Sequence, residues 1–142
     1  MKTIVSLSTF FCVLLITLAC AKKPKPGFST FKLDLPFDLK LNGSAMLDGD
    51  EFKLTFDALP EDSRCPKEVD CIQAGQARIT LLANLDGSDR NVEYVWPASQ
   101  IGNVTRTIGP FKVHLLDVSP YPVSGKLTKP EDYAIRLVVR KG

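Results

Sequence analysis

Two cysteines in the middle of the chain, Cys65 and Cys71, are the residues best placed to do chemistry. They enclose a short Cys-Pro-Lys-Glu-Val-Asp-Cys segment, which a disulfide would close into a small ring. A redox-active dithiol would need the two-residue spacing of thiol oxidoreductases, and this segment lacks it. A zinc site would need a fourth ligand, because His114 is the only histidine. We therefore expect a structural disulfide and no cofactor.

The other two cysteines lie near the N-terminus, where an uncharged apolar run ends at Ala19. The lysine- and proline-containing segment after Cys20 cannot continue a membrane-spanning helix. A small residue before the cysteine is typical of bacterial lipoproteins, although Thr17 stands where leucine is usual. We expect residues 1–19 to be a signal peptide and residues 20–27 a tether, with an acyl lipid such as palmitate on Cys20. The alternative is ordinary cleavage, which would release a soluble secreted or periplasmic protein.

The lipoprotein interpretation places the protein in the bacterial cell envelope, with the membrane as its first partner. The chain has 18 basic and 16 acidic residues, and loss of residues 1–19 removes one lysine, which leaves a net charge of +1. That balance predicts no nucleic-acid partner. The composition is uniform over residues 28–142, so we expect one domain there.

This domain is patterned as short β-strands. Residues 51–57 alternate strictly between apolar and polar types, and residues 77–85 lead through an Asp86-Gly87 turn into a returning strand. Further alternating runs occur at residues 31–41, 104–108, 111–118 and 134–140. We expect an all-β domain, an antiparallel β-sandwich of seven to eight strands with an immunoglobulin-like topology. A small β-barrel is the alternative, because the wide intersheet cysteine pair of antibody domains is missing.

Arg64 and Tyr121 stand out among the loop residues. In the structural interpretation, Arg64 pairs with a nearby acid, Asp62, Glu61 or Asp70, and Gly75 permits a positive φ before the next strand. In the functional interpretation, Arg64 and Tyr121 form an exposed anchor of the kind that dominates protein interfaces. The second interpretation requires that two loops far apart in sequence share one end of the sandwich.

Catalytic and metal-binding motifs are weak. The chain has no Gly-x-Ser-x-Gly elbow, and His114 falls on the polar side of its strand, so we do not expect an enzyme. The acids Asp48, Asp50 and Glu51 could bind calcium weakly. Their run is too short for an EF-hand loop and is more simply explained as a hairpin turn.

The block from Glu61 to Ala77 opens with Glu-Asp-Ser-Arg-Cys-Pro and continues through Cys71. It is followed downstream by Ser-Pro-Tyr-Pro at 119–122 and Asp-Tyr at 132–133. Together these residues resemble a family of uncharacterised secreted bacterial proteins and lipoproteins. The resemblance covers most of the mature domain and implies a β-sandwich with a disulfide-closed loop, without implying an activity. Members of this family carry an aromatic residue at the position of Gln73. If that aromatic ring contacts a ligand in the family, the contact is missing in this chain.

Two functions remain as expectations. The first is a non-enzymatic cell-envelope lipoprotein that binds an envelope protein partner through loops near Arg64 and Tyr121. The alternative is a module that binds a small ligand or calcium.

Overall fold

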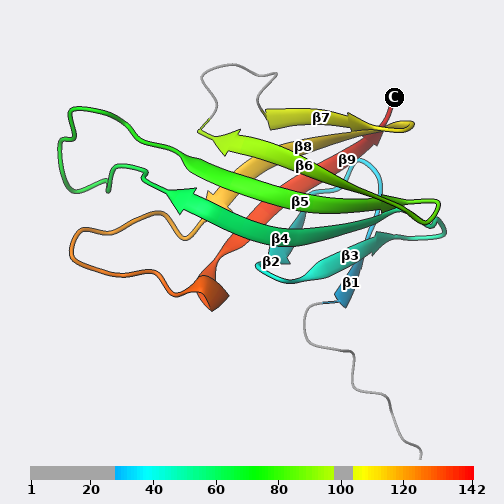
Figure 1. The fold of residues 1–142 in the computed structure, drawn as a ribbon, viewed down its shortest axis with the longest axis horizontal. Coiled ribbons are helices and arrows are strands. Elements are labelled where there is room, and N and C mark those ends of the chain that lie inside the picture. Colours follow the sequence, from blue (N-terminus) through cyan, green and yellow to red (C-terminus); the bar gives the residue numbers. More distant parts are fainter. Residues whose placement is uncertain (1–27, 98–103) are drawn as a thin grey trace, which may run out of the picture.

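The computed structural model describes residues 28–97 and 104–142, which fold into two packed β-sheets (Figure 1). One sheet has five strands in the order β1-β3-β4-β5-β6, and the other has four in the order β2-β9-β8-β7. The sheets do not close on each other, so the β-sandwich prediction is confirmed and the barrel alternative is wrong. The strands are β1 Phe28–Phe31, β2 Phe37–Lys40, β3 Ser44–Leu47, β4 Lys53–Asp62, β5 Ala77–Leu85, β6 Ser88–Trp96, β7 Thr105–Ile108, β8 Phe111–Ser119 and β9 Ala134–Lys141.

The order of the strands differs from the immunoglobulin order that we expected. Strands β3 to β6 are neighbours in chain order within one sheet, and β7 to β9 are neighbours in the other. An immunoglobulin domain instead divides its strands as A, B, E, D and C, F, G. Here tight turns favour consecutive pairing: Asp86 and Gly87 both have positive φ, as a two-residue hairpin turn requires.

Most predicted strands are present, and two differences have clear local causes. The hairpin of β5 and β6 is confirmed, with paired residues running from Ala77↔Trp96 to Leu85↔Ser88. The run at 31–41 is divided between β1 and β2, which lie in different sheets, because the chain turns at Asp34 with a positive φ of 62°. Strand β3 was not predicted, and together with the divided run it raises the number of described strands to nine.

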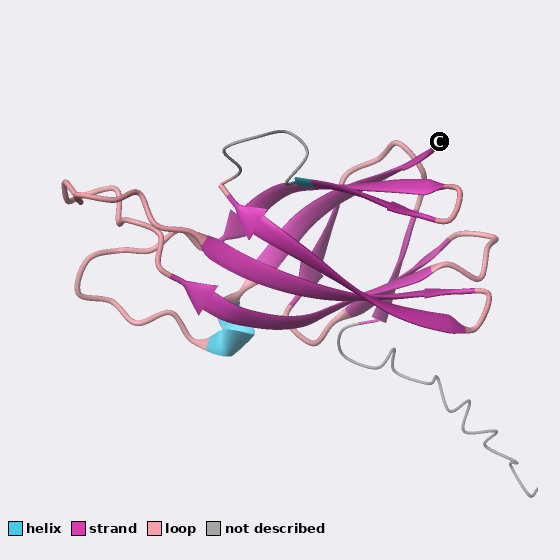
Figure 2. Ribbon diagram, turned by 45° about the horizontal axis from the view of Figure 1, so that its top comes forward, coloured by secondary structure: helices cyan, strands magenta, loops and turns pink. Residues whose placement is uncertain are grey.

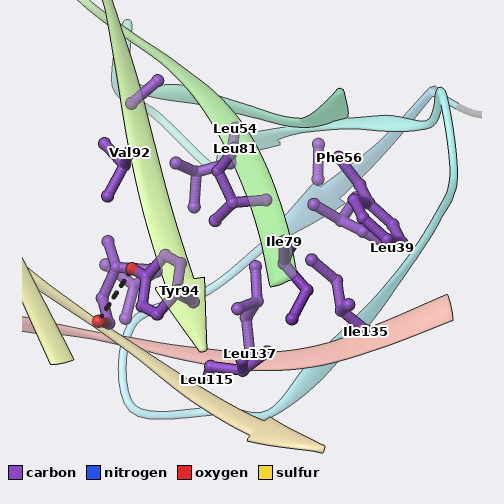
Figure 3. Close-up of a cluster of buried hydrophobic side chains, with 14 of the residues drawn as sticks. Leu39, Leu54, Phe56, Ile79, Leu81, Val92, Tyr94, Leu115, Ile135 and Leu137 are labelled. Atoms are coloured by element: carbon purple, nitrogen blue, oxygen red, sulfur yellow. Dashed lines mark hydrogen bonds between the residues drawn. The ribbon is translucent and has the colours of Figure 1, made fainter. Parts of the chain in front are cut away.

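The core lies between the sheets and is filled by the inward side chains of both (Figure 3). Leu54, Ile79 and Leu81 of the five-stranded sheet lie opposite Leu115 and Leu137 of the four-stranded sheet, and all five are buried. The alternating residues of 51–57 and 77–85 therefore point inward as their pattern predicted. Fully burying such a side chain contributes about 1.5–3 kcal/mol, so this layer is the main stabilising element.

Both ends of the sandwich carry loops, and the longer ones share one end (Figures 1 and 2). Residues 63–76 join β4 to β5, and we call this segment the ring loop because it contains the two cysteines. Residues 120–133 join β8 to β9, and we call this segment the proline loop. The two loops lie together at the left of Figure 1, and the C-terminus lies at the opposite end. We refer to the two loops together as the loop end.

Candidate functional site

The ring loop and the proline loop are held together by one buried side chain, Arg64. Its guanidinium makes a bidentate ion pair with Asp62, with Nε 2.7 Å from Oδ1 and Nη2 2.8 Å from Oδ2. The guanidinium also reaches the end of β8 and the start of the proline loop, where Nη1 donates to the Val118 carbonyl at 2.6 Å and Nη2 to the Pro120 carbonyl at 2.9 Å. Arginine suits this position because its planar fork can serve a carboxylate and two carbonyls at once.

Asp62 is the second half of this clamp, and it also bonds to the far end of the proline loop. Its Oδ2 also accepts a hydrogen bond of 2.9 Å from the hydroxyl of Tyr133, immediately before β9. Burial opposes ionisation of Asp62, but hydrogen bonds from Arg64 and Tyr133 outweigh it and lower the carboxyl pKa. Burial and the neighbouring Asp62 carboxylate raise the pKa of the Tyr133 hydroxyl. The clamp therefore consists of a carboxylate, a guanidinium and a neutral phenol.

The burial of Arg64 corrects the expectation that it is an exposed anchor. The residue is only 3% exposed, and its four guanidinium hydrogen bonds all go to protein groups. Of the three acids that we considered as partners, Asp62 is the one that pairs with it, while Glu61 pairs with the exposed Arg78 at 2.9 Å. Arg64 therefore positions the loops and is not available to touch a partner.

Tyr121 does lie at the surface, where the two loops meet. Its ring centroid is 5.1 Å from Cζ of Arg64 and 5.0 Å from Nζ of Lys67, so it contacts cations of the ring loop while remaining 37% exposed. Cation–π contacts of this kind hold an aromatic ring in place. A second link joins the loops nearby, where the amide of Ser124 donates to Glu68 at 3.4 Å. The two loops do share one end of the sandwich, as the functional interpretation required.

The disulfide between Cys65 and Cys71 is confirmed, with the two Cα atoms 6.0 Å apart. The two arms of the ring loop are joined to each other by backbone hydrogen bonds, which the amides of Cys65 and Ser63 donate to the carbonyls of Ala74 and Gln76. Gly75 allows this close approach, because its φ is +64° and an added Cβ would lie 1.7 Å from the Ser63 carbonyl oxygen. The predicted positive φ at this position is confirmed.

Exposed apolar side chains are concentrated at the loop end. The described residues include seven large hydrophobic side chains that are exposed, and five of them belong to the two loops: Val69, Ile72, Tyr121, Val123 and Leu127. Ile72 and Leu127 are almost fully exposed. The proline loop also bounds an open groove of about 420 Å³, lined by Ser119, Pro120, Tyr121, Val123, Lys126, Thr128 and Asp132. Exposed apolar side chains that lie beside a groove, on loops that are held in place, are typical of a binding surface.

The other candidate residues lie away from this surface or outside the described chain. Asp48 and Asp50 flank Gly49 in the β3–β4 turn, and across residues 28–97 and 104–142 no group of three His, Cys, Asp or Glu side chains could hold a metal ion. The calcium alternative through Asp48, Asp50 and Glu51 is therefore not supported. His114 lies on β8, half buried, with Nδ1 2.8 Å from the Thr105 hydroxyl. Burial and the nearby cations Arg140 and Lys112 lower its pKa.

Cys20 and the signal segment are outside the described residues. Within the described part of the chain, no helix has the length and hydropathy needed to cross a bilayer.

Comparisons with family models, with curated proteins and with solved structures give no match for this chain.

Proposed function

We propose that this protein is a cell-envelope lipoprotein whose loop end binds another protein. The observation that carries the proposal is the concentration of exposed apolar side chains on two loops that a buried clamp holds together. Binding energy in protein interfaces comes mainly from a few apolar and aromatic anchors, and it is greater when the anchors are ordered before binding. Tyr121 fits this role because it is exposed and is contacted by two cations.

The contacts that hold the two loops in place support the same proposal. Loops usually lose conformational entropy on binding, and this loss reduces affinity. In the loop end, the disulfide closes the ring loop, and Arg64 joins it to the proline loop. Little entropy then remains to be lost when a partner binds, which suits a specific interaction more than a chance exposure of apolar residues.

The lipid anchor is the second part of the proposal. Phe28 pairs with Ser44, which in turn pairs with Thr55, seven positions before Asp62 along β4. At about 3.3 Å per strand residue, the chain therefore enters the domain roughly 20 Å from the loop end. The eight residues of 20–27 span at most about 29 Å. A lipid on Cys20 would keep the domain near the membrane surface while leaving the loop end free for a partner.

Cross-linking in living cells tests the binding proposal. The tagged, natively processed chain is cross-linked and its partners are identified by mass spectrometry, alongside the variants Ile72→Ser, Tyr121→Ala and Leu127→Ser. Leu35→Ser and Leu116→Ser are matched controls, because these two exposed hydrophobic residues lie outside the two loops. We expect one reproducible partner, retained in the controls and lost in the loop variants at unchanged thermal stability. Equal loss in the controls would contradict the proposal.

Lipidation has a separate test that does not depend on a partner. Cells are supplied with an alkyne-labelled fatty acid, and label on the protein is compared between the native chain and Cys20→Ser. We expect the native chain to carry the label and the variant to carry none. Label that persists in the variant, or is missing from both, would refute an anchor at Cys20.

The groove of the proline loop favours one alternative, a small ligand. Its volume of about 420 Å³ lies in the range of small-molecule sites, and Lys126 and Asp132 give it opposite charges. A thermal-shift screen of polar metabolites on the native chain and on Lys126→Ala tests this alternative. A hit whose stabilisation disappears in Lys126→Ala, together with no captured protein, would favour the ligand-binding function.

A further inference from the structure

Strand β6 forms a long free edge of the five-stranded sheet (Figure 1). Among the described residues, β5 is its only hydrogen-bonded neighbour, and their register continues over nine pairs without a bulge. The other edge strands, β1, β2 and β7, have only four residues each. Proteins usually protect edge strands by making them short, by bulges, or with lysine and proline. Ser88–Trp96 has no bulge, lysine or proline and is nine residues long, and its charged side chains are Asp89, Arg90 and Glu93. These charges disfavour indiscriminate pairing, so β6 is open to a strand whose charges complement them.

The backbone groups that face this open edge follow from the turn. Asp86 and Gly87 form a two-residue turn with both φ angles positive, and in such a turn the amide of Ser88 bonds back to Leu85. Donor direction alternates along an antiparallel strand. The amides and carbonyls of Asp89, Asn91, Glu93 and Val95 therefore point away from β5, toward the free edge.

The side chains on the outer face of this edge determine which partner fits. Asp89, Asn91 and Glu93 are exposed on the same face, opposite the face on which Val92 and Tyr94 are buried. A second copy pairing antiparallel about Asn91 would place Asp89 opposite Glu93, which is a like-charge pair and therefore unfavourable. A strand with lysine or arginine at alternate positions would instead place a cation beside each acid.

We propose that β6 is a second binding edge, where a partner's extended segment with alternating basic residues adds a strand to the five-stranded sheet. Main-chain hydrogen bonds to residues 89–95 provide the attachment, and Asp89 and Glu93 select the basic face. This edge is separate from the loop end and does not depend on the function proposed for it.

A pair of synthetic peptides tests this proposal on the chain from residue 20 carrying Cys20→Ser. One nine-residue peptide has lysine at alternate positions among threonine and valine, and the other has glutamate in place of lysine. Binding is followed by fluorescence anisotropy. We expect the lysine peptide to bind about tenfold more tightly or better, and Glu93→Lys to reverse the preference. Amide NMR shifts should be concentrated at residues 89–95.

Two further variants separate backbone pairing from charge. Glu93→Pro removes the backbone N–H of residue 93, which points to the free edge, and leaves the hydrogen bonds between β6 and β5 intact. Glu93→Thr also removes the carboxylate but keeps this N–H. We expect the proline variant to bind the lysine peptide about tenfold more weakly than the threonine variant. Equal binding of the two peptides by the native chain would overturn the proposal. A concentration-dependent dimer that Glu93→Pro abolishes would overturn it too, by making a second copy the occupant.

Discussion

Replacing Arg64 by alanine should destabilise the domain strongly, because it leaves a buried carboxylate without its counter-ion. The side chains of Arg64 and Asp62 are 0% and 6% exposed, and Arg64 donates four hydrogen bonds from its guanidinium. Breaking a buried pair by removing one partner costs about 3–5 kcal/mol. A domain of this size has roughly 5–15 kcal/mol of total stability, so the midpoint temperature should fall on the order of 10–20 °C.

The chain provides a matched control for this experiment in Arg78, which pairs with Glu61 at 2.9 Å. Its side chain is 53% exposed and that of Glu61 is 39% exposed, so Arg78→Ala should leave the midpoint almost unchanged. Arg64→Lys should be intermediate, because an ammonium keeps the charge but cannot form the planar fork.

Urea denaturation followed by fluorescence of Trp96, the only tryptophan, measures all three variants on one scale. Trp96 lies at the end of β6 and packs against the core, so its emission reports loss of the sandwich. If Arg64→Ala costs no more than Arg78→Ala, then the buried clamp does not hold the two loops, and our explanation of the loop end is wrong.

Three further predictions concern the same end of the molecule. Gly75→Ala should cost much more stability than Gly87→Ala, because both have positive φ but only Gly75 would place its Cβ against backbone; thermal unfolding of the two variants compares them. Replacing Cys65 and Cys71 by serine should cost about 2 kcal/mol by chain entropy and loosen the ring loop, which hydrogen exchange would detect; unchanged exchange there would contradict this. The lowered pKa of Asp62 means that its stabilisation is present above the unfolded value of about 3.9 and is lost as pH falls through the folded value; a pH series of unfolding free energies should show this acid loss in the native chain and not in Asp62→Asn.

The alternating segments were predictable because their pattern reflects burial directly. Phe56 and Ile79 are buried where the two-residue period placed them, and the Asp86-Gly87 turn joins β5 to β6 as expected. Strand β3 was missed because four residues give too few alternations to recognise. The far end of β4 was also missed, because the strict alternation that predicted the strand stops at Asp57; register shifts on either side of Ala58 accommodate the continuing strand.

The loop end was only partly predictable. The disulfide and the positive φ of Gly75 followed from local sequence, because both depend on residues close together in the chain. The burial of Arg64 did not follow from local sequence, because its carbonyl partners Val118 and Pro120 are 54 and 56 positions further along the chain. Pairing over that distance depends on the strand order, and the expected immunoglobulin order differs from the observed one. An Asp-x-Arg sequence beside a disulfide ring was the available signal, and it equally suited an exposed anchor.

Partner capture by the loop end tests the proposed function most directly. The natively anchored chain and its Ile72→Ser/Leu127→Ser variant are cross-linked in cells, and the recovered proteins are quantified beside the Leu35→Ser/Leu116→Ser control. We predict one partner whose cross-links map to residues 63–76 or 120–133, recovered with the control and lost with the loop variant. Equal recovery with both variants, or cross-links that map elsewhere on the domain, would contradict a binding function for this surface.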